Sequence, residues 1–202
     1  MKISVASLTV AGTLLVASVV QAQEDPAEIL VSQEPAAATK IDGDVITVQN
    51  RIDIAEMIRI ADALDSAIDA KKWGVARKMF TNNVNADFNS LDGSAPETMP
   101  SRQLVNNWAG NFTKNKTSFH MRSNHRVTFF SDDEAVMLSH GYAWNRLASG
   151  ASPENGANAF WEMWGNYTHV FQRTPQGWKV NGIKFDLTAE RGNPYVRNTP
   201  GS

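Results

Sequence analysis

One stretch of the sequence, residues 117–130, constrains the fold more than any other. It reads TSFHMRSNHRVTFF, and its β-branched and aromatic residues are typical of a strand. Strand side chains point to opposite faces in turn, so we expect His120, Arg122 and Asn124 on one face. His125 then lies on the other face, and we interpret it as a surface residue. A face that is polar at several successive positions either meets water or lines a polar cavity.

Composition narrows the class of protein. The chain has 202 residues, of which 42% are hydrophobic and 20% charged, as expected for one globular domain with tails. A net charge of −2 predicts no nucleic-acid partner. The chain contains no cysteine, which excludes disulfides and thiolate metal sites. It also lacks the H-x-H and H-E-x-x-H spacings of metal sites, so we expect no metal. We also expect no other cofactor.

The first 50 residues divide into two predicted segments. Residues 1–22 resemble a signal peptide, because Lys2 precedes an apolar run and Ala22 ends a small-residue cleavage site. An uncleaved anchor helix is the alternative. Residues 23–50 are rich in Glu, Gln, Ala and Pro, which predicts a flexible arm. We therefore expect a periplasmic or secreted protein without a membrane partner after cleavage.

The remainder predicts an α+β domain over residues 51–192, followed by a C-terminal tail over 193–202. From Ile52, apolar residues recur every three or four positions, which indicates an amphipathic helix. Further helices are expected at residues 73–80 and 101–108, a loop at 89–100, and long strands after residue 116. This order predicts three N-terminal helices packed on a curved antiparallel sheet.

The first helix carries three aspartates beside its apolar stripe. Asp62, Asp65 and Asp69 are interpreted first as a solvated acidic edge, because charges often flank such a stripe. Asp69 borders the stripe directly, so a role in a functional site is the alternative for this residue.

Several local strings, in order, resemble a known family. They are A-I-D-A-K-K-W at the end of the first helix, T-x-x-H-x-x-x-N in the central strand, D-D-E-A-V, and H-V-F-Q-R-T-P-Q-G-W-K-V. Across residues 52–191 the chain is similar to SnoaL-like members of the nuclear transport factor 2-like superfamily. Scytalone dehydratase, hexachlorocyclohexane dehydrochlorinase and ketosteroid isomerase belong to that superfamily. The resemblance implies a cone-shaped fold.

The resemblance also implies a set of site residues. His120 stands where the dehydrochlorinase has a basic histidine, and Asp69 where it has the paired aspartate. An imidazole held by a carboxylate can take a proton from carbon. The substrate-binding residues implied by the resemblance or by strand position are Asn124, Asn145, Tyr167, Trp144 and Asn166.

Departures from the family pattern restrict the reaction. Asn145 replaces a second histidine of scytalone dehydratase, Lys72 replaces a frequent aspartate, and Ile68 stands where a tyrosine would precede Asp69. The scytalone dehydratase reaction itself is therefore not predicted.

Two functions remain open. One is a cofactor-free lyase or isomerase, of the dehydration or elimination type, acting on a small hydrophobic or ring-shaped molecule. The other is a non-catalytic module of the same fold that binds a small ligand or a partner. Homodimerisation through the outer sheet face is a separate hypothesis. We expect Arg122 and Arg126 to pair with carboxylates, and His140 and His169 to be half-buried structural residues.

Overall fold

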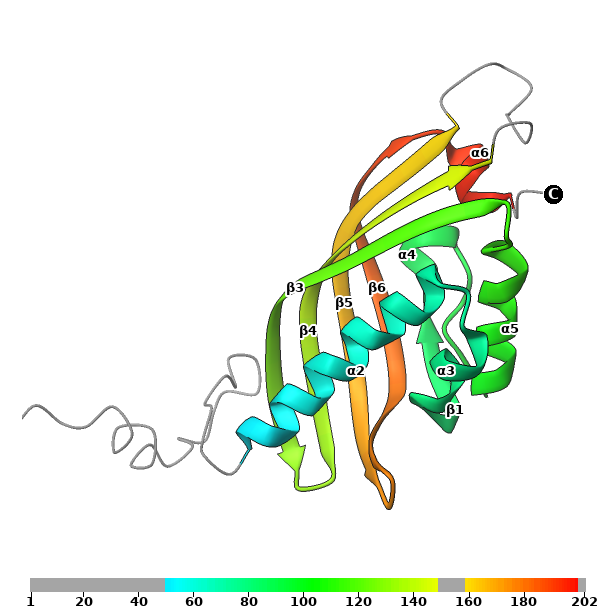
Figure 1. The fold of residues 1–202 in the computed structure, drawn as a ribbon. Helices are drawn as coiled ribbons and strands as arrows, with labels where there is room; N and C mark the ends of the chain where they lie inside the picture. The colour runs from blue at the N-terminus through cyan, green and yellow to red at the C-terminus, as the bar shows by residue number, and fades with distance from the viewer. Residues whose placement is uncertain (1–49, 149–158, 200–202) are drawn as a thin grey trace, which may run out of the picture.

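A computed structural model describes residues 50–148 and 159–199 of the protein. They form an α+β fold in which helices lie against one face of a curved six-stranded sheet (Figure 1). The predicted signal peptide, nearly all of the predicted arm and residues 149–158 lie outside these residues. The helices are α2 (Arg51–Asp69), α3 (Trp73–Lys78), α4 (Asn89–Asp92), α5 (Ser101–Asn111) and α6 (Pro194–Asn198). The strands are β1 (Phe80–Asp87), β2 (Glu97–Pro100), β3 (Lys116–Ser131), β4 (Glu134–Leu147), β5 (Phe160–Thr174) and β6 (Gly177–Gly192).

The sheet is mixed, whereas the sequence predicted an antiparallel one. The strand order is β2-β1-β6-β5-β4-β3. The long strands β3 to β6 pair antiparallel, but β1 runs parallel to β6. No tight hairpin joins β1 to β6, and the chain enters β1 from helix α3, so turn geometry does not impose an antiparallel pair.

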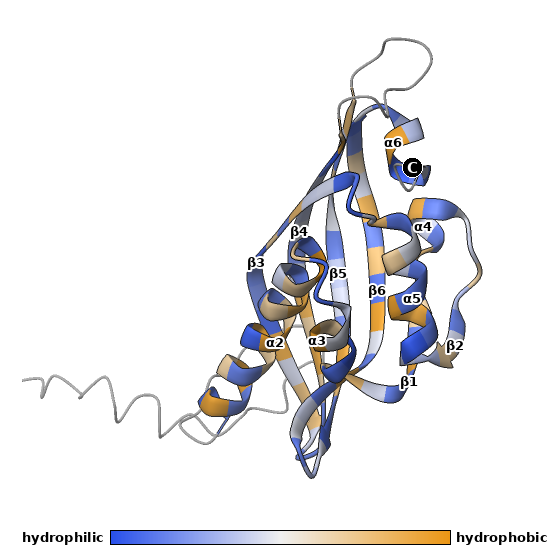
Figure 2. Ribbon diagram, turned by 45° about the vertical axis from the view of Figure 1, so that its right-hand side comes forward, coloured by the Kyte–Doolittle hydropathy of each residue, from blue (hydrophilic) through white to orange (hydrophobic). Residues whose placement is uncertain are grey.

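Helix α2 forms as predicted and carries residues of the candidate functional site described below. Its buried residues include Met57, Leu64 and Ile68, and Figure 2 shows apolar and polar residues alternating along α2 and α5. Asp53 in the first turn accepts hydrogen bonds from Arg173 at 2.7 Å and from the Trp178 indole at 3.0 Å. These contacts fix the start of α2 on the β5–β6 hairpin. Among the described residues, no helix has the length and apolarity needed to cross a bilayer.

Three short elements interrupt segments predicted as loop or tail. Residues 89–100 contain α4 and β2, and α6 follows β6. The backbone of Asn193 precedes α6, and its side chain accepts from the Tyr195 N–H at 3.1 Å. Val196 is fully buried, so α6 packs against the domain. Helices of four or five residues are too short to show an apolar period.

A β-bulge in β3 overturns the face predicted for His125. Pairing with β4 shifts between Ser123 and Arg126, where two residues oppose one. Asn124 adopts a left-handed φ of 54° there, which Asn tolerates better than most residues. The extra residue reverses the alternation, so His125 faces α2 with 13% of its side chain exposed. Arg126 is exposed, and Val127 is buried.

Candidate functional site

A cavity of about 430 Å³ lies between the inner face of the sheet and the helices. This volume is in the range of small-molecule pockets. Its polar lining includes Asp65, His120, Arg122, Asn145 and Arg197. Its apolar lining comes from α2, α4, α5 and the strands, and includes Ile68, Leu91, Met99, Leu104, Trp108, Phe112, Trp161, Met163, Tyr167 and Ile183.

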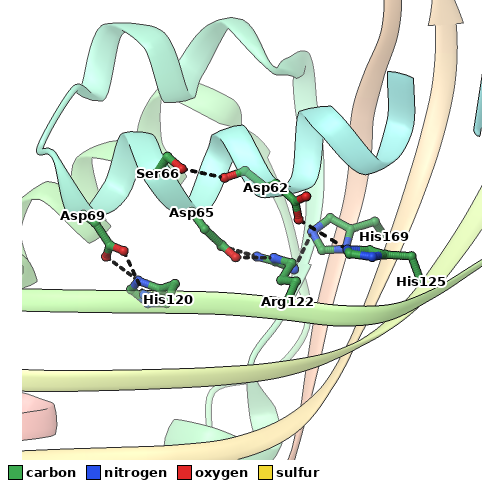
Figure 3. A network of polar contacts seen from close by, with 8 residues as sticks. All are labelled: Asp62, Asp65, Ser66, Asp69, His120, Arg122, His125 and His169. Carbon is green, nitrogen blue, oxygen red and sulfur yellow. Dashed lines mark hydrogen bonds and ion pairs between the residues drawn. The ribbon is translucent and has the colours of Figure 1, made fainter. Parts of the chain in front are cut away.

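His120 is held by Asp69 at two points. The ring Nδ1 lies 2.6 Å from Oδ1 of Asp69, and the backbone N–H of His120 donates to Oδ2 at 2.8 Å. Asp69 is the last residue of α2, and His120 is near the start of β3. The contact therefore joins helix to sheet (Figure 3), and both residues are largely buried.

The charge of Asp69 determines the tautomer of His120. Burial acts to raise the pKa of Asp69, but hydrogen bonds and attraction from His120 outweigh it, so its pKa is lowered. The ionised carboxylate can only accept, so Nδ1 of His120 carries the proton that points to it. In the neutral ring Nε2 is then the unprotonated nitrogen, and no hydrogen bond joins it to a described residue. His120 thus offers a lone pair to the cavity that it lines.

Aromatic and cationic groups surround this pair. The Phe112 ring meets the His120 ring edge-on, with centroids 5.6 Å apart. Lys71 donates to Ser118 at 3.0 Å, and burial lowers the pKa of Lys71. Lys116 is 1% exposed, and burial, followed by repulsion from Lys71, lowers its pKa to about 8.

Asp65 was predicted to lie on a solvated edge, but it is paired inside the protein. Its carboxylate accepts from Nε and Nη2 of Arg122, both at 2.7 Å. The carboxylate pairing predicted for Arg122 is confirmed. The solvated edge predicted for the aspartates is wrong for Asp69 and Asp65, because both face the sheet (Figure 3). Asp62 alone of the three aspartates is well exposed, with 53% of its side chain accessible.

Two of the predicted substrate-binding residues line the cavity. Asn145 is 2% exposed, and its Oδ1 has no hydrogen-bond partner among the described residues. Tyr167 is 7% exposed and lines the same cavity. Burial raises the pKa of the Tyr167 phenol to about 12, so the phenol stays protonated at neutral pH.

The other three predicted substrate-binding residues lie away from the cavity. Asn124 is exposed at the bulge, where its amide nitrogen is 3.4 Å from Nε2 of His140. Trp144 and Asn166 alternate with the inward-facing Asn145 and Tyr167, so they take the outer face. None of the three is among the cavity-lining residues.

The remaining histidines differ from the half-buried prediction. His140 is exposed on the outer face. His169 is 0% exposed, and its Nε2 accepts from Nη1 of Arg122 at 3.2 Å. Burial, followed by repulsion from the Arg122 cation, lowers the pKa of His169 well below its usual range.

Three further residues that line the cavity, on α5 and α6, were not predicted from the sequence. Asn107 and Asn111 on α5 and Arg197 on α6 all line it. The α5 residues share one helix face at four-residue spacing, a signal present in the sequence, whereas Arg197 depends on the unpredicted α6. Among residues 50–148 and 159–199, no group of three or more His, Asp or Glu side chains is arranged to hold a metal ion.

Comparison with known proteins agrees with this architecture. The SnoaL-like domain profile matches residues 49–184. A Kribbella flavida protein, Kfla4162, has a similar structure, with 23% identity, a TM-score of 0.65, and coverage of 74% of this chain and 97% of its own. A Novosphingobium aromaticivorans protein assigned as a scytalone dehydratase is 15% identical, with a TM-score of 0.60 and coverage of 73% and 92%. A hexachlorocyclohexane dehydrochlorinase, LinA type 2, is 17% identical, with a TM-score of 0.53 and coverage of 70% and 92%. No curated protein matches the chain.

Proposed function

The chain belongs to the SnoaL-like domain family, and we propose that it is a cofactor-free lyase or isomerase with His120 as its general base. The observation that carries this proposal is the contact of 2.6 Å between His120 and Asp69 beside a cavity of about 430 Å³. The fold it shares with a dehydrochlorinase and an assigned scytalone dehydratase supports the reaction class. The apolar lining favours a small hydrophobic or ring-shaped substrate.

The roles of the two residues follow from the geometry. Nε2 of His120 takes a proton from a substrate carbon, and Asp69 stabilises the imidazolium that forms. The imidazolium then returns the proton to another carbon in an isomerisation, or to a leaving hydroxide in a dehydration. One residue thereby serves as base and then as acid, and neither reaction needs a cofactor.

Proton exchange tests this proposal without knowledge of the natural substrate. The purified protein is incubated in D₂O with a panel of cyclic ketones and β-hydroxy ketones, and loss of C–H signal is followed by NMR. We expect His120→Ala to slow exchange or turnover by about 10²- to 10⁴-fold. His140→Ala is the matched control, because His140 is exposed on the outer face, and it should leave the rate unchanged.

A non-catalytic, ligand-binding protein would behave differently. Native mass spectrometry of the purified protein would then show a bound small molecule that His120→Ala retains, and neither protein would exchange any C–H of the panel. That result would reject His120 as a catalytic residue.

We also propose that the protein is exported and self-associates. Export rests on the leader pattern of residues 1–22, and N-terminal sequencing of the mature protein should begin at Gln23. Self-association rests on the outer sheet face, where Phe119, Met121 and Trp164 are 53%, 53% and 39% exposed. Light scattering after size exclusion should give a dimer mass, and a monomer at high concentration would contradict it.

A further inference from the structure

The pair formed by Asp65 and Arg122 faces the same cavity as His120, yet the proposed proton transfer does not use it. Both side chains are buried, with 6% and 2% of their surfaces exposed. Burial acts to lower the pKa of Arg122, but attraction and hydrogen bonds from Asp65 outweigh it and raise its pKa. Arg122 is therefore a permanent cation in the cavity wall.

The guanidinium of Arg122 is fixed before any ligand arrives. Asp65 binds one edge through two contacts of 2.7 Å. The Tyr167 ring covers one face, with its centroid 3.8 Å from Cζ. Nη1 also donates to Nε2 of His169 at 3.2 Å. Donors that are already oriented stabilise a developing charge without the cost of reorganisation.

Arg122 keeps hydrogen-bonding capacity beyond these contacts. A guanidinium has five N–H donors, and the described residues accept from three of them. Arg122 follows His120 by two positions on β3, ahead of the bulge, so the two side chains leave one sheet face about 6.7 Å apart. A small molecule in the cavity can contact both residues at once.

A general base that removes a proton from carbon needs a hydrogen-bond donor that stabilises the negative charge left on the substrate. When a C–H bond next to a carbonyl breaks, its electron pair becomes the C=C bond of an enolate, and the carbonyl π pair moves onto oxygen. The negative charge therefore develops on that oxygen, which hydrogen-bond donors in a buried site stabilise strongly.

We propose that Arg122, held by Asp65, binds this substrate oxygen, and that the substrate is a carbonyl compound with a hydrogen on the adjacent carbon. This inference rests on the proposed function of His120. Because Asp65 balances the charge of Arg122, the site favours a neutral carbonyl whose oxygen becomes charged over a substrate that is already a carboxylate.

A phenol probes the oxygen site independently of turnover. The phenolate, like an enolate, carries its charge on an oxygen attached to a planar carbon. We would titrate the protein with 4-nitrophenol and read the ionised fraction of the bound probe from its absorbance, with nitrobenzene as the uncharged analogue. The bound phenol should be more ionised than the free phenol at the same pH. An unchanged or smaller ionised fraction would overturn the proposal, and no variant is needed for that test.

Variants then assign the effect to Arg122. The double variant Asp65→Leu/Arg122→Met removes both charges together, so no buried charge is left uncompensated. We expect it to bind the phenolate about tenfold or more weakly and to bind nitrobenzene unchanged. Arg126→Met, an exposed arginine on the same strand, is the matched control and should bind both probes as the wild type does.

The outcomes separate this inference from the function on which it rests. Equal weakening of phenolate and nitrobenzene in the double variant would make Arg122 a structural residue only. His120→Ala should keep the preference for phenolate, and its loss there would assign the preference to His120 instead. If proton exchange fails but the phenolate preference depends on Arg122, the oxygen site stands and the base is wrong.

Discussion

Asp69 accepts hydrogen bonds from both the ring Nδ1 and the backbone N–H of His120, at 2.6 and 2.8 Å. The backbone contact sets the position of the strand residue, and the ring contact sets its orientation and tautomer. One carboxylate thereby determines which imidazole nitrogen meets the cavity.

We predict that Asp69→Asn changes the tautomer of His120. In the wild type the carboxylate requires a proton on Nδ1, whereas a carboxamide can also donate, so the Nε2–H form gains population. The ¹⁵N chemical shifts of the two ring nitrogens report this directly. The wild type should show a protonated Nδ1 and an unprotonated Nε2, and identical shifts in the variant would contradict the role of Asp69.

Breaking the buried pair should destabilise the protein more than deleting it. Arg122→Met leaves Asp65 buried without its partner, and we expect a loss of about 3–5 kcal/mol in the free energy of unfolding. Asp65→Leu/Arg122→Met should lose clearly less, as measured by urea denaturation. The exposed pair of Lys184 and Asp186, 2.9 Å apart, supplies the control: Lys184→Met should change stability little. A double variant no more stable than the single one would reject the argument.

Lys116 should make the protein more stable as the pH rises above about 8. Its pKa is lower in the folded protein than the usual value of 10.5, so the unfolded chain binds more protons between these two values. Stability then increases with pH across this window, by at most about 3 kcal/mol. Lys116→Met should reduce the increase, leaving the smaller contribution of Lys71, whose pKa is also lowered, and Lys114→Met, at an exposed position, should keep it. Urea denaturation from about pH 7 to 11 measures both. Equal pH dependence in Lys116→Met and the wild type would contradict the prediction.

Gly141 makes room for a cavity residue. A Cβ at this position would clash with the Tyr167 ring. The ring cannot move freely, because Arg122 lies 3.8 Å from its centroid and the Phe185 ring centroid is 4.6 Å away. Gly141→Ala should therefore cost about 1–3 kcal/mol of stability.

A second glycine provides the comparison for thermal denaturation. Gly74 lies in α3, and a Cβ there meets nothing within 4 Å. Gly74→Ala should be neutral or stabilise the protein by up to about 1 kcal/mol, since alanine is the better helix former. If both substitutions had the same effect on stability, the contact with Tyr167 would not be the cause of the loss.

The three aspartates of α2 show which part of the site could be anticipated. Four residues of helix rise about 6 Å, and two residues of strand span about 6.7 Å, so Asp69 and Asp65 can meet His120 and Arg122 in register. Both spacings are visible in the sequence. The sequence contains no sign of how α2 lies across β3, so a solvated edge was the first interpretation of these aspartates.

The sequence by itself determined the secondary structure of the long elements, because apolar residues repeat every three to four positions in α2 and at alternate positions in the strands. Through the family resemblance, it also identified His120 and Asp69 as a candidate pair. Only the tertiary structure decided which neighbour of each pair faces the cavity, Asn145 rather than Trp144 and Tyr167 rather than Asn166. The physical reason is that alternation fixes relative faces only, and one bulge at Asn124 reverses them for the rest of a strand.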